Sequence, residues 1–236
     1  MPAKTTKTPK ATNRDLIIDA FFNVVAAKGM DDVAMAEVAK EAGLKLSDVR
    51  DEFTTPYDIL AAYARRVDRQ VLDMIPEDLM EDTPRERVFD VLMMRFDALA
   101  DQKEALGEMF SETRSNPLAL AAWNQITIVS MGWMMTGVGL EPKGPAGLAR
   151  AQGLVFVFAR AFRVWLKDDD PGMARTMAEL DRRLRDADRS TSMLNNLQSA
   201  LRPLSFLRRR RRRFDYPTAD QPFDDGGDPP ARNEMH

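Results

Sequence analysis

The chain has 236 residues, of which 44% are hydrophobic and 30% charged, so it can bury a core and is neither collagen-like nor mucin-like. It contains no cysteine and its one histidine is His236, which excludes disulfide frameworks, thiolate metal sites and sites that need a buried imidazole. The formal net charge is −3, so binding to nucleic acid would require a local basic patch. With no signal-like N-terminus, we expect a cytoplasmic protein.

Three helices are predicted in residues 14–62. The first covers 14–28 and stops before Gly29, and two short helices follow at 35–42 and 47–53, joined through Gly43. A short helix, a glycine turn and a second short helix behind a longer one are typical of a DNA-binding helix-turn-helix domain. Residues 1–13 are polar and carry three lysines without an acid, which predicts a flexible basic arm.

Helical spacing continues through residues 63–190, and no alternating run predicts a strand. The further predicted helices cover 56–75, 84–101, 103–114, 117–136, 148–167 and 171–188. The stretch 115–140 carries no formal charge, but its Asn, Gln, Ser, Thr and Gly residues favour a buried helix over a membrane span. We therefore expect an all-α fold, with a larger helical domain after the first three helices.

Large flexible apolar residues recur through this helical domain. Such residues at helical spacing usually form a core, but the 15 methionines of the chain would also suit an adaptable apolar pocket. The candidate pocket residues are Phe89, Met93, Phe96, Met109, Trp123, Met131, Trp133, Met134, Phe158, Phe162 and Trp165. We expect an apolar small-molecule ligand there.

No pattern of catalytic residues is present. The sequence has no Gly-rich phosphate loop and no metal-ligand spacing, and Asp168–Asp170 are interpreted as a solvated loop. We expect no enzyme activity, no metal and no cofactor.

The segment RDLIIDAFFNVVAAKGMDDVAMAEVAKEAGLKLSDVRDEFTTPYDILAAY resembles the N-terminal domain of TetR-family repressors. The positions that match the family pattern are Gly29, Val38-Ala39, Ala42-Gly43, Val49, Phe53 and Leu60. The resemblance implies a TetR-like fold and a homodimer, with the subunit contact made by the helices near 148–167 and 171–188. It also implies an operator DNA as partner and an apolar effector.

The DNA-contact positions depart from that pattern. Where the family places a small residue, glycine, aromatic residues and a lysine, this chain has Lys45, Ser47, Arg50, Glu52 and Tyr57. Residues 15–62 hold ten acidic and four basic side chains, which disfavours binding to phosphates. The candidate DNA contacts are Lys4, Lys7, Lys10, Arg14, Lys45, Ser47, Arg50 and Tyr57. A helix-turn-helix retained for packing after loss of DNA binding is the alternative.

Residues 160–188 are similar to the end of the coenzyme Q biosynthesis accessory proteins, on Trp165, Asp168–Pro171, Thr176 and Leu180–Arg183. That resemblance implies a TetR-like protein that binds an isoprenoid lipid, assists ubiquinone synthesis and does not read DNA. It also implies a membrane-associated C-terminal helix. The sequence thus leaves two functions open, a DNA-binding regulator first and a lipid-binding protein second.

Residues 191–213 form a predicted amphipathic helix followed by six arginines, and 214–236 form a Pro-, Gly- and Asp-rich tail. The candidate contacts to a membrane or to anions are Leu194, Leu197, Leu201, Leu204, Arg208, Arg209, Arg210, Arg211, Arg212 and Arg213. This segment has three possible destinations: the inner face of a membrane as a peripheral contact, the protein's own helical domain, or the DNA backbone.

Overall fold

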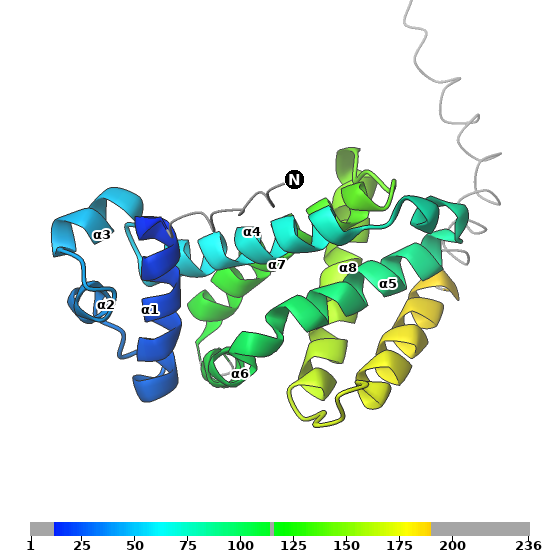
Figure 1. Ribbon diagram of the computed structural model, residues 1–236. Helices are drawn as coiled ribbons and strands as arrows, with labels where there is room; N and C mark the ends of the chain where they lie inside the picture. Colours follow the sequence, from blue (N-terminus) through cyan, green and yellow to red (C-terminus); the bar gives the residue numbers. More distant parts are fainter. Residues whose placement is uncertain (1–11, 114–115, 190–236) are drawn as a thin grey trace, which may run out of the picture. The chain divides into compact units, whose positions relative to one another are not determined.

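The computed structural model describes residues 12–113 and 116–189, and every regular element in these residues is a helix (Figure 1). The elements are α1 (Asn13–Lys28), α2 (Met35–Glu41), α3 (Leu46–Glu52), α4 (Pro56–Met74), η1 (Glu77–Glu81), α5 (Pro84–Leu99), η2 (Ala100–Gln102), α6 (Lys103–Glu112), α7 (Pro117–Gly137), α8 (Gly144–Trp165) and a helix at 174–189. The prediction of an all-α fold is confirmed.

Short capping sequences determine where the longer helices begin. The hydroxyls of Thr12, Thr55 and Thr83 each accept a hydrogen bond from the backbone N–H three residues later. The residue at that position is an Asp or Glu, and its carboxylate accepts a hydrogen bond from the backbone N–H of the threonine. Proline occupies the first turn of α4, α5, α7 and α8, where its missing N–H needs no partner. These caps and prolines act within a few residues, so local sequence favours these starts.

The first three helices form a headpiece, defined here as residues 12–55. Val38 of α2, Val49 of α3 and Phe53 are buried in its interior. The headpiece is connected to the remaining helices, here called the body, by α4, which packs on α1 and further along on α5 and α7. α1 also packs against α6, so a second contact joins headpiece and body.

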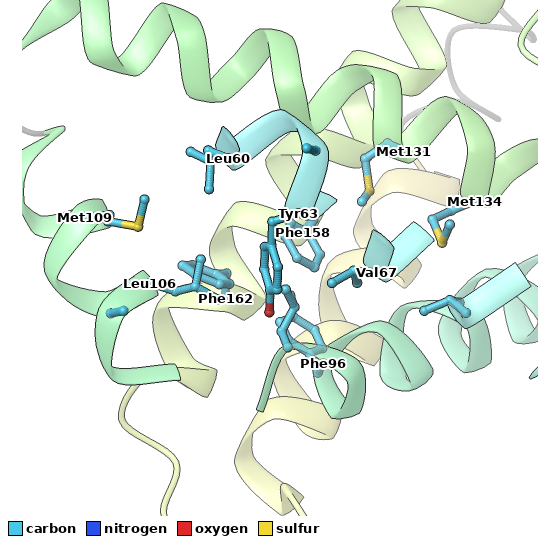
Figure 2. Packing of buried hydrophobic residues seen from close by; sticks show 14 of the residues in the cluster. Leu60, Tyr63, Val67, Phe96, Leu106, Met109, Met131, Met134, Phe158 and Phe162 are labelled. Atoms are coloured by element: carbon cyan, nitrogen blue, oxygen red, sulfur yellow. The ribbon is translucent and has the colours of Figure 1, made fainter. Parts of the chain in front are cut away.

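The core of the body is aromatic and rich in methionine, and Figure 2 shows part of it. Phe96 stacks on Phe158 with ring centroids 5.0 Å apart, and Phe162 lies 5.3 Å from Trp165. Met109, Met131 and Met134 are buried in the same cluster. Seven of the predicted pocket residues therefore belong to the core: Phe96, Met109, Met131, Met134, Phe158, Phe162 and Trp165. Phe89, Met93 and Trp123 are half-buried and pack against its edge.

Trp133 was wrongly included among the residues expected to line an interior pocket. It projects from α7 with 55% of its surface exposed. The sequence pattern misplaced it because α7 is apolar on all sides, so periodicity could not tell its inner face from its outer face.

The helix boundaries differ from prediction in a few places. α8 begins at Gly144, four residues before the expected start, and Pro145 lies in its first turn, where a missing N–H needs no partner. The last helix begins at 174 instead of 171. The two short helices η1 and η2 were not predicted. The predicted helix 191–207, its arginines and both tails lie outside the described residues.

None of the helices in residues 12–113 and 116–189 is long and apolar enough to cross a membrane. α7 packs one side against α4, α5 and α8, but its other side exposes Val129 and Trp133, so the uncharged stretch is only partly buried, where a buried helix was expected.

Asp168 is buried, so the interpretation of Asp168–Asp170 as a solvated loop was wrong for this residue, whereas Asp169 and Asp170 are exposed. Its Oδ2 accepts hydrogen bonds from the backbone N and the Oγ1 of Thr176, at 2.9 and 2.7 Å. Asp170 accepts from the backbone N–H of Ala174 at the start of the same helix. Burial raises the pKa of Asp168, but the Thr176 hydrogen bonds outweigh it, so that the pKa lies below its ordinary value of 3.8. The carboxylates thus cap the helix at 174–189.

Asp168→Ala should lower the free energy of unfolding by about 1–3 kcal/mol, because it leaves the buried donors of Thr176 without an acceptor. A lowered folded pKa means that the carboxylate stabilises the fold above pH 3.8 and that this contribution is lost as the pH falls through the folded value. The difference in free energy of unfolding between the variant and the wild type, measured with urea, should therefore be large at neutral pH and shrink below pH 3.8. The control is Asp169→Ala at the exposed neighbouring position; an equal loss there would contradict the capping role.

Candidate nucleic-acid interface

α3 presents a polar face to solvent on the side away from the headpiece interior. Val49 points inward, and Leu46 is 52% exposed. Residues three and four positions apart share one side of a helix, so the exposed residues form a continuous surface. We call it the α3 strip; it consists of Lys45, Leu46, Ser47 and Arg50.

The α3 strip has the chemistry needed to contact base edges. Lys and Arg donate to guanine, a serine hydroxyl donates or accepts, and an apolar side chain can contact a thymine methyl. Arg50 Nη1 also donates to the Thr54 hydroxyl at 3.3 Å, which orients the guanidinium along the helix. The sequence analysis selected Lys45, Ser47 and Arg50 but missed Leu46, because its exposure is known only once the three helices are packed.

Most acids of the headpiece and of the start of α4 are engaged within the protein. Seven of the ten in residues 15–62 accept a hydrogen bond or pair with a cation: Asp15, Asp19, Glu37, Glu41, Asp48, Glu52 and Asp58. On α3, Asp48 accepts from the Lys45 backbone N–H at 3.1 Å. Asp51 is exposed one turn after Ser47, so it is the carboxylate beside the α3 strip.

Arg14 has a different role from the predicted DNA contact. Its Nη1 pairs with Glu52 Oε2 at 3.2 Å, and its guanidinium lies 4.8 Å from the centre of the Phe53 ring. It thus holds α1 against the end of α3, and its charge is shared with a carboxylate. A pocket of about 260 Å³ beside this pair is also lined by Arg65 of α4.

Tyr57 was predicted as a DNA contact, but it faces the body. It lines a pocket of about 300 Å³ together with Met30 and Val33 of the headpiece and Leu118 of α7. Burial and the negative charges of Asp31 and Glu112 raise the pKa of Tyr57. The remaining predicted contacts, Lys4, Lys7 and Lys10, lie outside the described residues.

Glu112, at the end of α6, ties the headpiece to the body. Its two carboxylate oxygens accept from the backbone N–H of Met30, at 3.2 and 3.0 Å. Gly29 precedes this contact with a positive φ of 84°, and a Cβ built there would lie 2.4 Å from Glu112 Oε1. Glycine is therefore required at position 29 both by its backbone conformation and by the approach of Glu112.

No protein-family model matches the chain. A curated relative, the HTH-type transcriptional regulator PksA of Bacillus subtilis, is 31% identical over 97 residues, which are 41% of this chain and 46% of the relative. The match thus spans about half the length of that relative.

Solved structures show the same fold. The TetR transcriptional regulator from Nitrosomonas europaea superposes with a TM-score of 0.59 at 19% identity, over 74% of this chain and 97% of that one. A TetR transcriptional regulator from Rhodococcus sp. RHA1 gives a TM-score of 0.51 at 17% identity, over 75% and 96%. The chain therefore has the TetR fold that the sequence resemblance predicted.

Gly29→Ala should destabilise the protein more than Gly43→Ala. Both glycines have positive φ, but nothing lies within 4 Å of a Cβ at Gly43, whereas at Gly29 the Glu112 carboxylate must move. The expected excess is about 1.5–3 kcal/mol, the value of a hydrogen bond to a charged group, and thermal unfolding of both variants measures it. In a Glu112→Ala background the excess should decrease but not vanish, because the Gly29 backbone, at φ 84° and ψ 167°, lies in a region open essentially only to glycine. An unchanged excess would show that the Glu112 contact contributes nothing to it.

Proposed function

We propose that the protein is a TetR-type transcriptional regulator that binds operator DNA as a homodimer and responds to an apolar effector. The TetR fold and the similarity to PksA support the regulatory class. The observation that carries the proposal is the α3 strip, a polar surface with the two cations Lys45 and Arg50 and the adjoining carboxylate of Asp51, on the second helix of a helix-turn-helix. In this motif the second helix enters the major groove.

The charges of the headpiece predict weak, salt-sensitive binding. The internal hydrogen bonds of the acids fix their positions but do not remove their charge, and Arg14 is already paired. Phosphate contacts must then come from Lys45, Arg50 and the arm lysines. Asp51 would favour a cytosine amino group at its position and disfavour other bases.

The dimer contact is proposed on α7 and α8. α7 contains no charged residue, and its exposed Val129 and Trp133 continue onto exposed Leu148 and Phe156 of α8. Asn124 and Gln152 exchange two hydrogen bonds, at 3.3 and 2.9 Å, so the outer faces of the two helices lie side by side. An exposed apolar area of this kind marks an interaction surface.

The helix at 174–189, which was expected to share the subunit contact, carries ion pairs between its own turns, and its Asp181 also pairs with Arg85 of α5 at 3.4 Å. Arg185 pairs with Asp181 at 2.6 Å, and Arg183 with Glu179 at 2.7 Å. The dimer proposal therefore moves from this helix to α7.

The lipid-binding alternative gains no support from the comparisons. The membrane contact that it requires depends on residues 191–213, which are outside the described part. The DNA measurement below also distinguishes the two functions, because the lipid-binding protein would not bind an operator.

Lys45→Glu with Arg50→Glu should abolish the mobility shift of a fragment from the protein's own promoter region. The double variant Lys45→Gln with Arg50→Gln is a milder change that still allows binding to be measured. If both side chains contact phosphates, its slope of log binding constant against log salt concentration should be smaller in magnitude than that of the wild type by about 2. The matched control is Lys143→Glu with Lys167→Glu, which changes the net charge equally at two exposed body positions. No wild-type shift at low salt, or equal loss in the control, would overturn the proposal.

Phe156→Lys should convert the dimer into a monomer, because it places a charge in the proposed apolar contact, where the native ring is 66% exposed in the single chain. Light scattering after gel filtration measures the mass directly. Met177→Lys, on the last helix and 38% exposed, is the control that should stay dimeric. If Phe156→Lys leaves the dimer intact and Met177→Lys dissociates it, the subunit contact lies on the helix at 174–189 and the proposed contact is wrong.

A further inference from the structure

Three polar side chains from three helices meet inside the body. Asp68 of α4 and Arg95 of α5 are each only 5% exposed, and they form an ion pair. The hydroxyl of Ser130, on α7, donates to the same Asp68 oxygen that Arg95 Nη1 contacts. We call this group the Asp68–Arg95–Ser130 cluster.

The cluster leaves one buried donor without a partner. Arg95 Nε is shielded from solvent and makes no hydrogen bond. The guanidinium carbon lies 5.7 Å from the centre of the Phe158 ring, so one side of the cation is covered by an aromatic face. A buried N–H without an acceptor is unfavourable, and a ligand that brought an acceptor atom to it would remove that cost.

The charge of the cluster restricts the acceptor. Asp68 and Arg95 neutralise one another, so an added carboxylate would be a second buried anion without its own cation. A ketone or ester oxygen accepts the same hydrogen bond without bringing a charge. The surroundings are apolar, with Phe96, Phe158 and Met131 in the adjoining core.

We propose that Arg95 Nε recognises the carbonyl oxygen of a neutral, largely apolar ligand. The inference deepens the proposed function, because this ligand would be the effector, but its binding can be measured without DNA. Space for an alkyl chain would come from movement of Met131 and Met134, which are buried on one face of α7 next to Ser130 and have adaptable side chains.

Occupation of Arg95 would act on α4. Asp68 belongs to the helix that leads into the headpiece, and its ion pair is a polar link from that helix to α5. A ligand oxygen at the same guanidinium changes the hydrogen bonding of this link, so ligand binding and headpiece position become coupled.

The test uses the full chain and three ten-carbon probes, 2-decanone, decanoate and decane. We expect 2-decanone to bind at least about tenfold more tightly than decane, since one satisfied buried donor is worth roughly that factor, and decanoate to bind no better than decane. Calorimetry measures the affinities. The ¹⁵N-detected Nε–H resonance of Arg95, assigned by its loss in Arg95→Lys, should shift with 2-decanone only.

Arg95→Lys keeps a cation for Asp68 but lacks the Nε–H, so it should bind 2-decanone no better than decane. If that variant does not fold, the wild-type affinities for the three probes decide the question. Equal wild-type binding of 2-decanone and decane, tighter binding of decanoate, or an unmoved Arg95 resonance would overturn the proposal. If the protein binds 2-decanone selectively but does not shift DNA, the proposed regulatory function is wrong and the proposed ligand site stands.

Discussion

The buried face of α4 is the constraint on which the arrangement of the protein depends. At its beginning Tyr63 packs on Phe22 of α1, with ring centroids 4.4 Å apart, and further along Asp68 is paired with Arg95 of α5. Headpiece and body therefore share one continuous helix, and a change in its packing at one end must be felt at the other. Burial of apolar side chains supplies most of the stabilisation, while the ion pair fixes which residues of α4 and α5 lie opposite each other.

A second link between headpiece and body runs through Glu112 and the loop after α1. It joins α6 to the headpiece through backbone hydrogen bonds of Met30, so it depends on the position of α6 and not on the side chain at position 30. With α4 it forms two separate connections from the body to the helix-turn-helix. Under the proposed function, these two connections would give an effector in the body a physical route to the α3 strip.

The TetR fold is compatible with both the regulatory and the lipid-binding function, so the fold does not distinguish them. The charges on the surface of the headpiece distinguish them better. The headpiece has an excess of acids, and the structure shows that many of them cap helices or bind neighbouring cations. Their internal roles explain why a helix-turn-helix can be acidic in sum and still present Lys45 and Arg50 outward. Under the proposed function, a few exposed cations would set the DNA affinity, so the salt dependence of binding tests this function.

The sequence by itself determined the helical class, the headpiece and the starts of α4, α5 and α7, since Thr, Asn and Pro at helix N-termini act within a few residues. Tertiary structure alone decided that Arg14 pairs with Glu52, that Tyr57 faces the body, and that Trp133 is exposed. It also revealed the Asp68–Arg95–Ser130 cluster, whose members are 27 and 62 residues from Asp68 along the chain. Periodicity reports which residues share a face of one helix, but the neighbour that covers this face is chosen by packing between helices distant in sequence.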